Sequence, residues 1–261
     1  MQKRKMIMKT SGCYLSIVIP ALNEGGRLGS TLDALKLHLE TESIYKNKNI
    51  EVVVVAANAS DNTHDVAAGY ISQIPNFKIL KPGKKLGKGR DVQYGMLRSR
   101  GKYILFMDAD LATPLRHIPI FLSTIEKDSS SEVLIAVRNL RNHHNNYLRR
   151  GLSNTGNVLY RLLGGVWVSD SQCGFKLFTK RSVKICFTKQ TIMGWGFDME
   201  ILAIAKQNNI GIKQMPVNDW KHIPDGPFER GDVGKILSNT LQSLGDLFLI
   251  MGHRVRRDYL K

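Results

Sequence analysis

The sequence predicts an α/β protein in which a mostly parallel sheet carries helices on both faces. Short β-branched apolar runs alternate with segments of helical spacing through the first half of the chain, which is typical of βαβ units. Polar or charged residues follow several of these runs, where ligands of parallel sheets bind. With 261 residues and 43% hydrophobic content, the chain is long enough for one substantial core or two unequal lobes.

The expected elements follow in order along the chain. Apolar, β-branched runs predict strands, and a change to helical spacing predicts the helices between them. The predicted strands are "YLSIVIP", "IEVVVVAA", "FKIL", "YILFM" and "EVLIAV". The predicted helices are Arg27–Glu40, Asp61–Gln73 and Gly89–Ser99. The polar clusters at strand ends are Asn23 with Glu24, Asn58 to Asp61, Asp108 with Asp110, and Arg138.

Composition indicates an anionic partner. Lys and Arg number 38 against 22 Asp and Glu, and the net charge of +16 suits phosphates, nucleic acid or an acidic membrane surface. The three cysteines are odd in number and lack metal-ligand spacing, which favours reduced thiols in a cytosolic setting. No apolar run reaches the roughly 18 residues that span a bilayer, and "MQKRKMIMK" lacks a signal-peptide core, so we expect a cytoplasmic protein.

A last helix is expected between Gly234 and Met251. Six apolar residues lie near one face of it at helical spacing: Ile236, Leu237, Leu241, Leu244, Phe248 and Leu249. This face is either core or a surface that lies on a membrane. Core is the favoured interpretation, because most apolar stripes in globular chains are buried.

The stretch "YILFMDADLATP" places two aspartates directly after an apolar strand. Carboxylates so close together repel each other, and they persist where a cation, usually a metal, sits between them and a ligand. The alternative is an ordinary turn before a helix that starts near Pro114. Upstream, "GKKLGKGR" matches neither the P-loop nor the dinucleotide-binding spacing, and it remains a basic glycine-rich loop suited to diphosphate contact through Lys88.

In their order, the motifs resemble those of inverting family 2 glycosyltransferases with the GT-A fold. The motifs are "SIVIPALNE", "VVVVAANASDNT", "LGKGRDVQYGM", "RGKYILFMDADLATP", "DSQCGFKLFTK" and "GWGFDMEIL". The resemblance covers about Leu15 to Ile250 and is nearest to the dolichyl-phosphate and other polyprenyl-phosphate sugar transferases. "DSQCGFKLF" and the alanine of "DADLAT" are more similar to the β-glucosyltransferase branch than to the mannosyltransferase branch.

The resemblance implies a donor site at the strand ends. It assigns Asp108 and Asp110 to ribose and to a Mg²⁺ or Mn²⁺ ion that bridges the donor diphosphate, with His222 as a late metal ligand. The expected donor-binding residues are Pro20, Ala21, Asn23, Glu24, Asn58, Asp61, Lys88, Asp108, Ala109 and Asp110. The alternatives are a helix start for Asn23 and Glu24 and a surface loop for His222.

Two positions depart from the family pattern. The second strand usually ends in two aspartates, the first of which meets the nucleotide base, whereas this chain has Ala56 and Ala57. Alanine cannot accept a hydrogen bond from a base, so base recognition is expected to shift to Asn58 or to main-chain groups. The other departure is Asp91, where a small residue is more usual.

The resemblance also implies an acceptor site in the second half of the chain. "LRRGLSNTG" is similar to the family's acceptor-phosphate pattern and gives Arg149 and Ser153, with Arg138 as a second guanidinium. Asp170, Gln172 and Gly174 are expected to border the sugar, and Asp198 and Glu200 to stand near donor and acceptor. The alternatives are a solvated basic helix start for Arg149 and Ser153, and helix capping for Asp198 and Glu200. The expected catalytic residues are Asp110, Arg149, Ser153, Arg138 and Asp198.

The expected activity is metal-dependent, inverting transfer of a hexose, with glucose as first choice, to a dolichyl or other polyprenyl monophosphate. UDP-glucose is the first expected donor and GDP-mannose the second. The alternatives are a family 2 enzyme with a soluble or saccharide acceptor, and a basic nucleic-acid-binding protein, which would leave the aspartate pair unexplained. We expect a basic segment (1–13), a GT-A domain (14–233) and an amphipathic helix with a basic tail (234–261), in peripheral contact with an anionic membrane surface on the cytosolic side.

Overall fold

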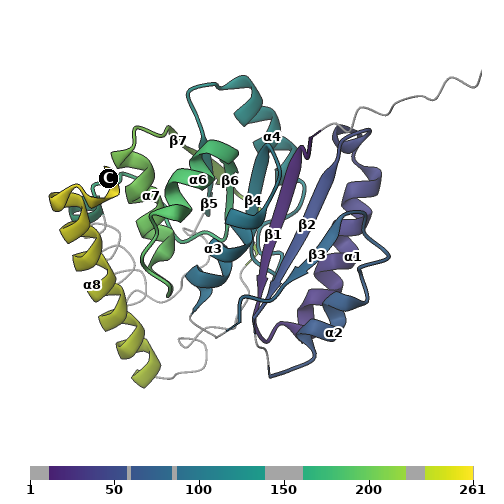
Figure 1. Ribbon diagram of the computed structural model, residues 1–261, viewed down its shortest axis with the longest axis horizontal. Coiled ribbons are helices and arrows are strands. Elements are labelled where there is room, and N and C mark those ends of the chain that lie inside the picture. Colours follow the sequence, from purple (N-terminus) through teal and green to yellow (C-terminus); the bar gives the residue numbers. More distant parts are fainter. Residues whose placement is uncertain (1–11, 58–59, 84–86, 139–160, 222–232, 261) are drawn as a thin grey trace, which may run out of the picture.

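A computed structural model describes residues 12–57, 60–83, 87–138, 161–221 and 233–260. Its centre is a seven-stranded sheet in the order β3-β2-β1-β4-β6-β5-β7, with helices on both faces (Figure 1). The strands are β1 (Leu15–Ala21), β2 (Ile50–Ala56), β3 (Phe77–Leu80), β4 (Tyr103–Met107), β5 (Val133–Arg138), β6 (Phe175–Thr179) and β7 (Ile212–Val217). The predicted α/β class with a mostly parallel sheet is confirmed.

The helices fill the connections between strands. They are α1 (Gly25–Thr41), α2 (Thr63–Ala68), α3 (Lys88–Arg98), α4 (His117–Lys127), α6 (Lys180–Thr188), α7 (Phe197–Gln207) and α8 (Val233–Arg256), with short 3₁₀ turns at Ser43–Tyr45 and Asp258–Leu260. Several predicted helix boundaries are wrong, including the end of the last helix, which is Arg256 instead of Met251. The first helix starts at Gly25 instead of Arg27, and the predicted helix Asp61–Gln73 is α-helical only over Thr63–Ala68 and continues as turns.

Strand β6 is the exception to the parallel arrangement. It pairs antiparallel with β4 on one side and with β5 on the other, whereas the remaining pairs are parallel. The carboxyl ends of the parallel strands and the amino end of β6 therefore meet at one edge of the sheet. The residues after β1, β4, β5 and β7 and before β6 are brought together at this edge.

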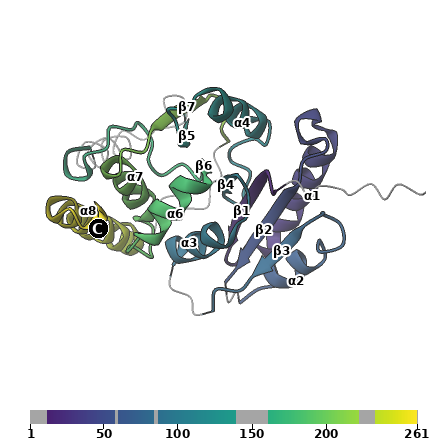
Figure 2. The same ribbon diagram turned by 45° about the horizontal axis from the view of Figure 1, so that its top comes forward.

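Helices cover both faces of the sheet (Figure 2), and each face has its own apolar layer. On one face, α1 and α4 contribute Leu28, Leu32 and Phe121 to a layer with Ile17 and Val54. On the other face, helices α3, α6, α7 and α8 form a second layer with the remaining strand residues. Their side chains in this layer include Val92, Met96, Phe187, Phe197, Ile201 and Ile250. Because β-strand side chains alternate between faces, the continuous apolar runs of β1 and β2 supply both layers.

Helix α8 corrects the prediction that its apolar face is core. Leu247 and Ile250 are buried, but Leu241, Phe248 and Leu249 are each more than half exposed. Ile236 and Leu237 have side chains outside the described residues. Among the helices of the described chain, none has the length and apolar character needed to cross a membrane.

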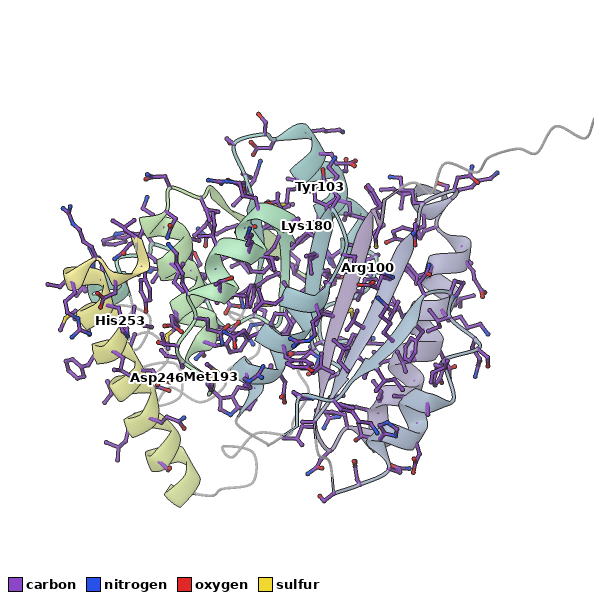
Figure 3. The ribbon with its side chains drawn as sticks, in the orientation of Figure 1. Arg100, Tyr103, Lys180, Met193, Asp246 and His253 are labelled. Atoms are coloured by element: carbon purple, nitrogen blue, oxygen red, sulfur yellow. The ribbon has the colours of Figure 1, made fainter. Side chains whose placement is uncertain are left out.

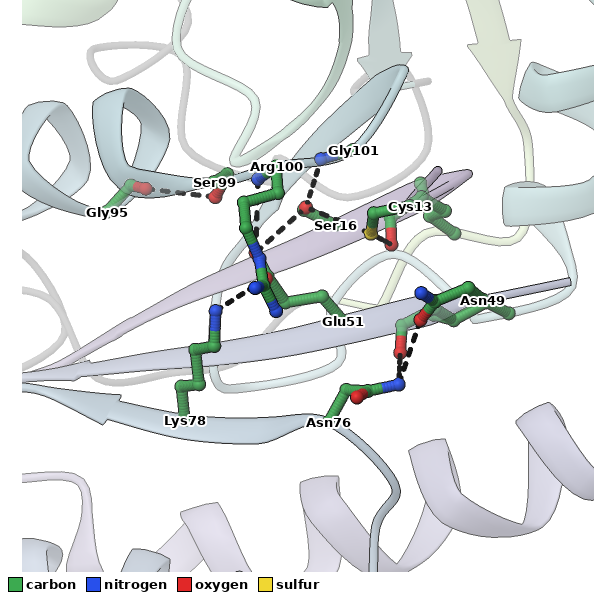
Figure 4. Close-up of polar contacts among 12 residues, drawn as sticks. Cys13, Ser16, Asn49, Glu51, Asn76, Lys78, Gly95, Ser99, Arg100 and Gly101 are labelled. Atoms are coloured by element: carbon green, nitrogen blue, oxygen red, sulfur yellow. Dashed lines mark hydrogen bonds and ion pairs between the residues drawn. The ribbon is translucent and has the colours of Figure 1, made fainter. Parts of the chain in front are cut away.

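A polar network closes the opposite end of the sheet (Figure 4). The Glu51 side chain is fully buried, and its carboxylate accepts hydrogen bonds from Ser16 Oγ at 3.1 Å, Lys78 Nζ at 2.8 Å and Arg100 Nε at 2.9 Å. Burial alone would raise the pKa of Glu51, but Lys78 and Arg100 outweigh it and lower the pKa. This network ties β1, β2, β3 and the start of β4 together, far from the ligand edge.

Candidate active site

Asp108 follows the last residue of β4 and is fixed by two neighbours, Gly174 and Lys88. Its backbone amide donates to the Gly174 carbonyl at 2.9 Å, and its Oδ1 lies 2.6 Å from Lys88 Nζ. A Cβ on residue 174 would overlap the Asp108 carboxylate, so glycine is required there. The start of β6 and the start of α3 therefore set the position of Asp108.

Asp110 lies in a turn beside this ion pair. Its Oδ1 accepts a hydrogen bond from the Ala112 amide at 2.9 Å, and Leu111 has a positive φ of 54°, which is uncommon for a residue with a side chain. Burial, with the nearby charge of Asp108, raises the pKa of the Asp110 carboxyl. The turn considered as an alternative does form, and it places two carboxylates at the carboxyl end of β4.

Lys88 begins helix α3, next to the glycine-rich loop. Gly87 has a φ of 124°, and a Cβ on Gly89 would lie 2.6 Å from Phe197 Cβ, so both glycines let α3 approach the segment before α7. Burial would lower the pKa of Lys88, but Asp108, Asp198 and Asp110 together raise it. The ammonium therefore stays charged at the amino end of a helix, where anions bind favourably.

A second, fully buried ion pair lies behind the first. Lys176 of β6 contacts the Asp198 carboxylate and donates to the Cys173 carbonyl at 2.7 Å. Burial raises the pKa of Asp198, whereas Lys176 and Lys88 lower it. Asp198 is thus held inside the protein, adjacent to Lys88, and its predicted catalytic role stays a prediction.

Glu200 serves the fold around α7. Its carboxylate accepts hydrogen bonds from the Thr191 amide at 2.9 Å, the Ile192 amide at 2.7 Å and the Tyr259 hydroxyl at 2.9 Å. Both Asp198 and Glu200 lie in the first turn of α7, but the helix has no side-chain cap hydrogen bond, and the two carboxylates bond instead to Lys176 and to the loop before the helix. Glu200 connects α7 to the loop before it and to the end of the chain.

The residues expected at the nucleoside surround the ends of β1 and β2. Pro20 and Ala21 end β1, and Asn23 has a φ of 57° and accepts from the Ser60 amide at 2.9 Å. Asp61 accepts from the amides of Gly25 at 2.9 Å and Thr63 at 3.0 Å, so it links the starts of α1 and α2.

Five further residues lie on this side of the sheet edge. Glu24 forms an ion pair with Arg27 at 2.7 Å. Ala56 and Ala57, at the end of β2, are buried, and the Ala109 carbonyl accepts from Thr31 Oγ1 at 2.6 Å. Asp91, the other departure, is buried in the first turn of α3, where a helix amino terminus favours a carboxylate.

On the opposite side, Arg138 at the end of β5 is clamped by Asp170. Arg138 Nε and Nη2 reach the two Asp170 carboxylate oxygens at 2.6 Å and 2.9 Å, and the Trp220 ring centroid lies 5.3 Å from the guanidinium. Burial opposes the charge, but Asp170 raises the pKa of Arg138. The pair is neutral overall, so Arg138 is positioned but largely compensated.

Several predicted site residues lie outside the described residues: Asn58, Arg149, Ser153 and His222. Within the described ranges, no cluster of three or more His, Cys, Asp or Glu side chains forms a metal cage. The sequence reasoning missed Lys176, Trp195, Asp219 and Trp220, which lie in or directly after elements that it did not assign. Asp219 and Trp220 follow "IKQMPV", whose lysine, glutamine and proline give no clear strand signal.

The fold and the site together define a glycosyltransferase of the GT-A class. A carboxylate pair follows β4, a lysine faces it from the amino end of α3, and one antiparallel strand interrupts the sheet at this point. The sequence profile of glycosyl transferase family 2 matches residues 16–186. The chain belongs to this family.

Curated relatives match most of the chain. It is 34% identical over 241 residues to "Dolichyl-phosphate beta-glucosyltransferase ALG5A" of Trichomonas vaginalis, covering 90% of this chain and 74% of the relative. It is 34% identical over 220 residues to the dolichyl-phosphate beta-glucosyltransferase of Dictyostelium discoideum, with coverages of 80% and 67%. The human dolichyl-phosphate beta-glucosyltransferase is 31% identical, with coverages of 80% and 68%.

Solved structures share the fold at low sequence identity. Glucosyl-3-phosphoglycerate synthase from Mycobacterium tuberculosis, in complex with UDP, has a TM-score of 0.67 at 15% identity and covers 92% of this chain and 80% of its own. Its complex with Mn²⁺, UDP and phosphoglyceric acid has a TM-score of 0.66 at 16% identity, with coverages of 92% and 79%. These likenesses concern the fold.

Proposed function

We propose that the protein transfers glucose from UDP-glucose to a dolichyl or other polyprenyl monophosphate and gives a β-linked lipid-phosphate sugar. The observation that carries the proposal is the similarity to dolichyl-phosphate beta-glucosyltransferases along 80% to 90% of the chain. The Asp108 and Asp110 pair, at the sheet edge where such enzymes need a donor site, supports it. GDP-mannose is the second candidate donor.

In the proposed reaction, an acceptor phosphate oxygen forms a bond to the anomeric carbon as the bond from that carbon to the diphosphate breaks. A phosphate monoester has a second pKa of about 6, so the acceptor is mostly a dianion at neutral pH. No side chain has to remove a proton. Attack from the face opposite the leaving UDP turns an α-linked donor into a β-linked product.

The main task of the protein is to bring anions together. Lys88 supplies a positive charge at the amino end of α3, beside the expected diphosphate. Arg138, oriented by Asp170, stands across the edge, and Arg149 and Ser153 remain the proposed acceptor-phosphate ligands. Arginine suits this role because its planar guanidinium can hold two phosphate oxygens at once.

The carboxylate pair fits a Mg²⁺ or Mn²⁺ ion. Such ions bind through one or two carboxylates and take their other ligands from water and substrate phosphates, so a full protein cage is not needed. Burial first, and then the charge of Asp108, raise the pKa of Asp110, and a bound cation would favour its ionised form. Asp108 and Asp110 would hold the ion, which when bound would stabilise charge on the leaving diphosphate.

The lipid acceptor calls for a membrane surface. The net charge of +16 supports peripheral contact with an anionic leaflet on the cytosolic side. We expect the protein to sediment with membranes and to be released by high salt, which screens exposed charges.

The direct test is a transfer assay with defined donors and acceptors. Purified protein with Mn²⁺ or Mg²⁺ should convert dolichyl phosphate and UDP-glucose to a product whose β configuration is visible by NMR, and should act more slowly with GDP-mannose. 3-Phosphoglycerate is the water-soluble control acceptor. Equal transfer to it, or an α-linked product, would contradict the proposal.

A further inference from the structure

Helix α8 has two apolar faces, and the protein covers one of them. Leu247 and Ile250 are buried in the layer formed with α7. Leu241, Phe248 and Val255 are exposed to 60%, 59% and 76%. An apolar side chain that is exposed singly is ordinary, but a row of them on one helix indicates a surface that meets something else.

The exposed side chains form a continuous stripe. Leu241, Phe248 and Val255 are seven residues apart, close to two helical turns, so they lie on one face over roughly 20 Å. Leu249 lies beside this row and is also more than half exposed. A straight apolar stripe of this length, on a helix that does not span a bilayer, suits a flat apolar boundary.

The charges of α8 favour an anionic partner. Among its described exposed residues, the only charged ones are Arg254 and Arg256. The acidic groups are partly buried and engaged: the Asp246 carboxylate accepts from the Gly196 amide, and Asp258, just beyond the helix, pairs with Arg256 at 3.1 Å. The apolar stripe is thus accompanied by positive charge at its carboxyl end.

A neighbouring segment lies against the carboxyl end of α8 and also carries exposed apolar side chains. Arg254 Nη1 donates to the carbonyls of Leu162 and Leu163, both at 3.2 Å, which holds the helical turn at 161–164 against α8. This segment carries Leu162 and Trp167, which are both strongly exposed. Tryptophan is enriched where one end of a side chain is apolar and the other is wet, as at membrane interfaces.

The side of α8 that packs on the protein contacts the loop before α7, and this loop also contacts Lys88 of the candidate active site. A Cβ on Gly194 would lie 2.7 Å from Gln242 Nε2, and one on Gly196 would overlap Asp246, so the loop before α7 packs closely on α8. Figure 3 shows Met193 of this loop close to Asp246 in projection. Trp195 of the loop lies over Lys88, with 4.9 Å between the ammonium and the ring centroid.

We propose that the face of α8 formed by Leu241, Phe248, Leu249 and Val255, with Leu162 and Trp167, lies in the interface of an anionic bilayer. This inference rests on the proposed function, since a lipid acceptor is what makes such an orientation useful. The helix lies parallel to the surface, its exposed arginines lie at the level of the lipid phosphates, and the loop that carries Trp195 faces the side from which the acceptor arrives.

The test is flotation of the full-length protein with vesicles of phosphatidylcholine alone or mixed with phosphatidylserine, without any sugar donor. The double variant Leu241→Ser, Phe248→Ser should bind the mixed vesicles about tenfold more weakly than the parent, because two apolar side chains no longer enter the interface. The matched control is Leu37→Ser, Ile71→Ser, which alters side chains exposed to 61% and 57% elsewhere on the surface. It should bind within about twofold of the parent.

Two further measurements distinguish a failure of the membrane-binding inference from a failure of the proposed transfer activity. Unchanged vesicle binding by the first variant would overturn the inference, as would light scattering that shows a dimer which this variant dissociates. With a short, water-soluble polyprenyl phosphate, parent and variant should transfer glucose equally, and only transfer to long-chain acceptor in vesicles should fall. Absence of transfer by the parent would refute the proposed function, whereas the flotation result would still decide the membrane face.

Discussion

At the scale of single residues, Asp110 combines a cost to the fold with a proposed role in the reaction. Its pKa is raised in the folded protein relative to the unfolded chain, so the ionised carboxylate at neutral pH lowers the free energy of unfolding. Asp110→Asn should therefore retain or slightly increase the melting temperature, while glucosyl transfer falls by at least about a hundredfold. Calorimetry and the transfer assay measure the two effects.

The control for that substitution is Asp65→Asn, which removes an exposed carboxylate on α2 and should change neither quantity. Full activity of Asp110→Asn, or full turnover in excess chelator, would contradict the proposal that transfer depends on a metal ion held by Asp108 and Asp110.

Gly174 offers a second experiment at this scale. Alanine there would overlap the Asp108 carboxylate and displace it from Lys88, whereas a Cβ at Gly245, on the exposed side of α8, has no neighbour within 4 Å. Gly174→Ala should reduce transfer strongly and weaken nucleotide binding. Gly245→Ala should stabilise α8 by roughly 0.5–1 kcal/mol without changing transfer. Calorimetric titration of UDP with Mn²⁺ compares the two variants, and equal affinity in both would contradict the role given to Asp108.

At the scale of elements, the Glu51 network joins three strands through a buried carboxylate. Glu51→Gln removes the charge that pairs with Lys78 and Arg100, and because these two partners are partly exposed to water, we expect a loss of about 1–2 kcal/mol in the free energy of unfolding at pH 7. Because the network lies at the opposite end of the sheet from Asp108, the folded variant should keep the parent's KM for the donor. Urea unfolding at low temperature gives the stability.

The same network predicts a direction with pH. The pKa of Glu51 is lowered in the folded state from its ordinary value of 4.5, so its contribution is complete above that pH. It is lost as the pH falls through the lower, folded-state pKa. The stability difference between parent and Glu51→Gln should therefore shrink below about pH 4.5. A constant difference down to acidic pH would show that packing, and not charge, carries the effect.

Five of the seven strands in the described part of the chain could be predicted from the sequence, and two could not. The strands β1 to β5 were predicted because each is a short, nearly uninterrupted apolar run. β6 contains the buried Lys176, which breaks the apolar run. Its partner Asp198 is 22 residues away in the sequence, so no local pattern reveals the ion pair or the antiparallel direction of the strand. β7 lies at the sheet edge and has exposed residues and a proline, so its composition resembles a loop.

The site shows the same division. Asp108, Asp110 and Lys88 could be selected because they flank a strand and a helix start. The Arg138 clamp could not be anticipated, since Asp170 is 32 residues away and only the sheet topology brings it to the end of β5. The apolar pattern of α8 predicted a helix but not which face the protein covers, because both of its faces carry apolar residues.

At the scale of the whole molecule, ligand binding should report on the site without any turnover. Ligands that bind only the folded state stabilise it, and a hundredfold excess over Kd gives about 2.7 kcal/mol. For a chain of this size, UDP with Mn²⁺ should raise the melting temperature by about 5 °C or more, and either alone should do less. Asp110→Asn should lose most of this shift. An equal shift in that variant would place the nucleotide elsewhere.

The antiparallel course of β6 also bears on how such enzymes diversify. β5 ends and β6 begins at the same edge of the sheet, because the two strands are antiparallel neighbours. A connection between two antiparallel neighbours does not have to cross a face of the sheet. Its length and composition can therefore change during evolution while the strand pairing and the carboxylates of Asp108 and Asp110 stay in place. We therefore expect variants that differ in the number of residues between β5 and β6 to keep nucleotide binding while their choice of acceptor changes.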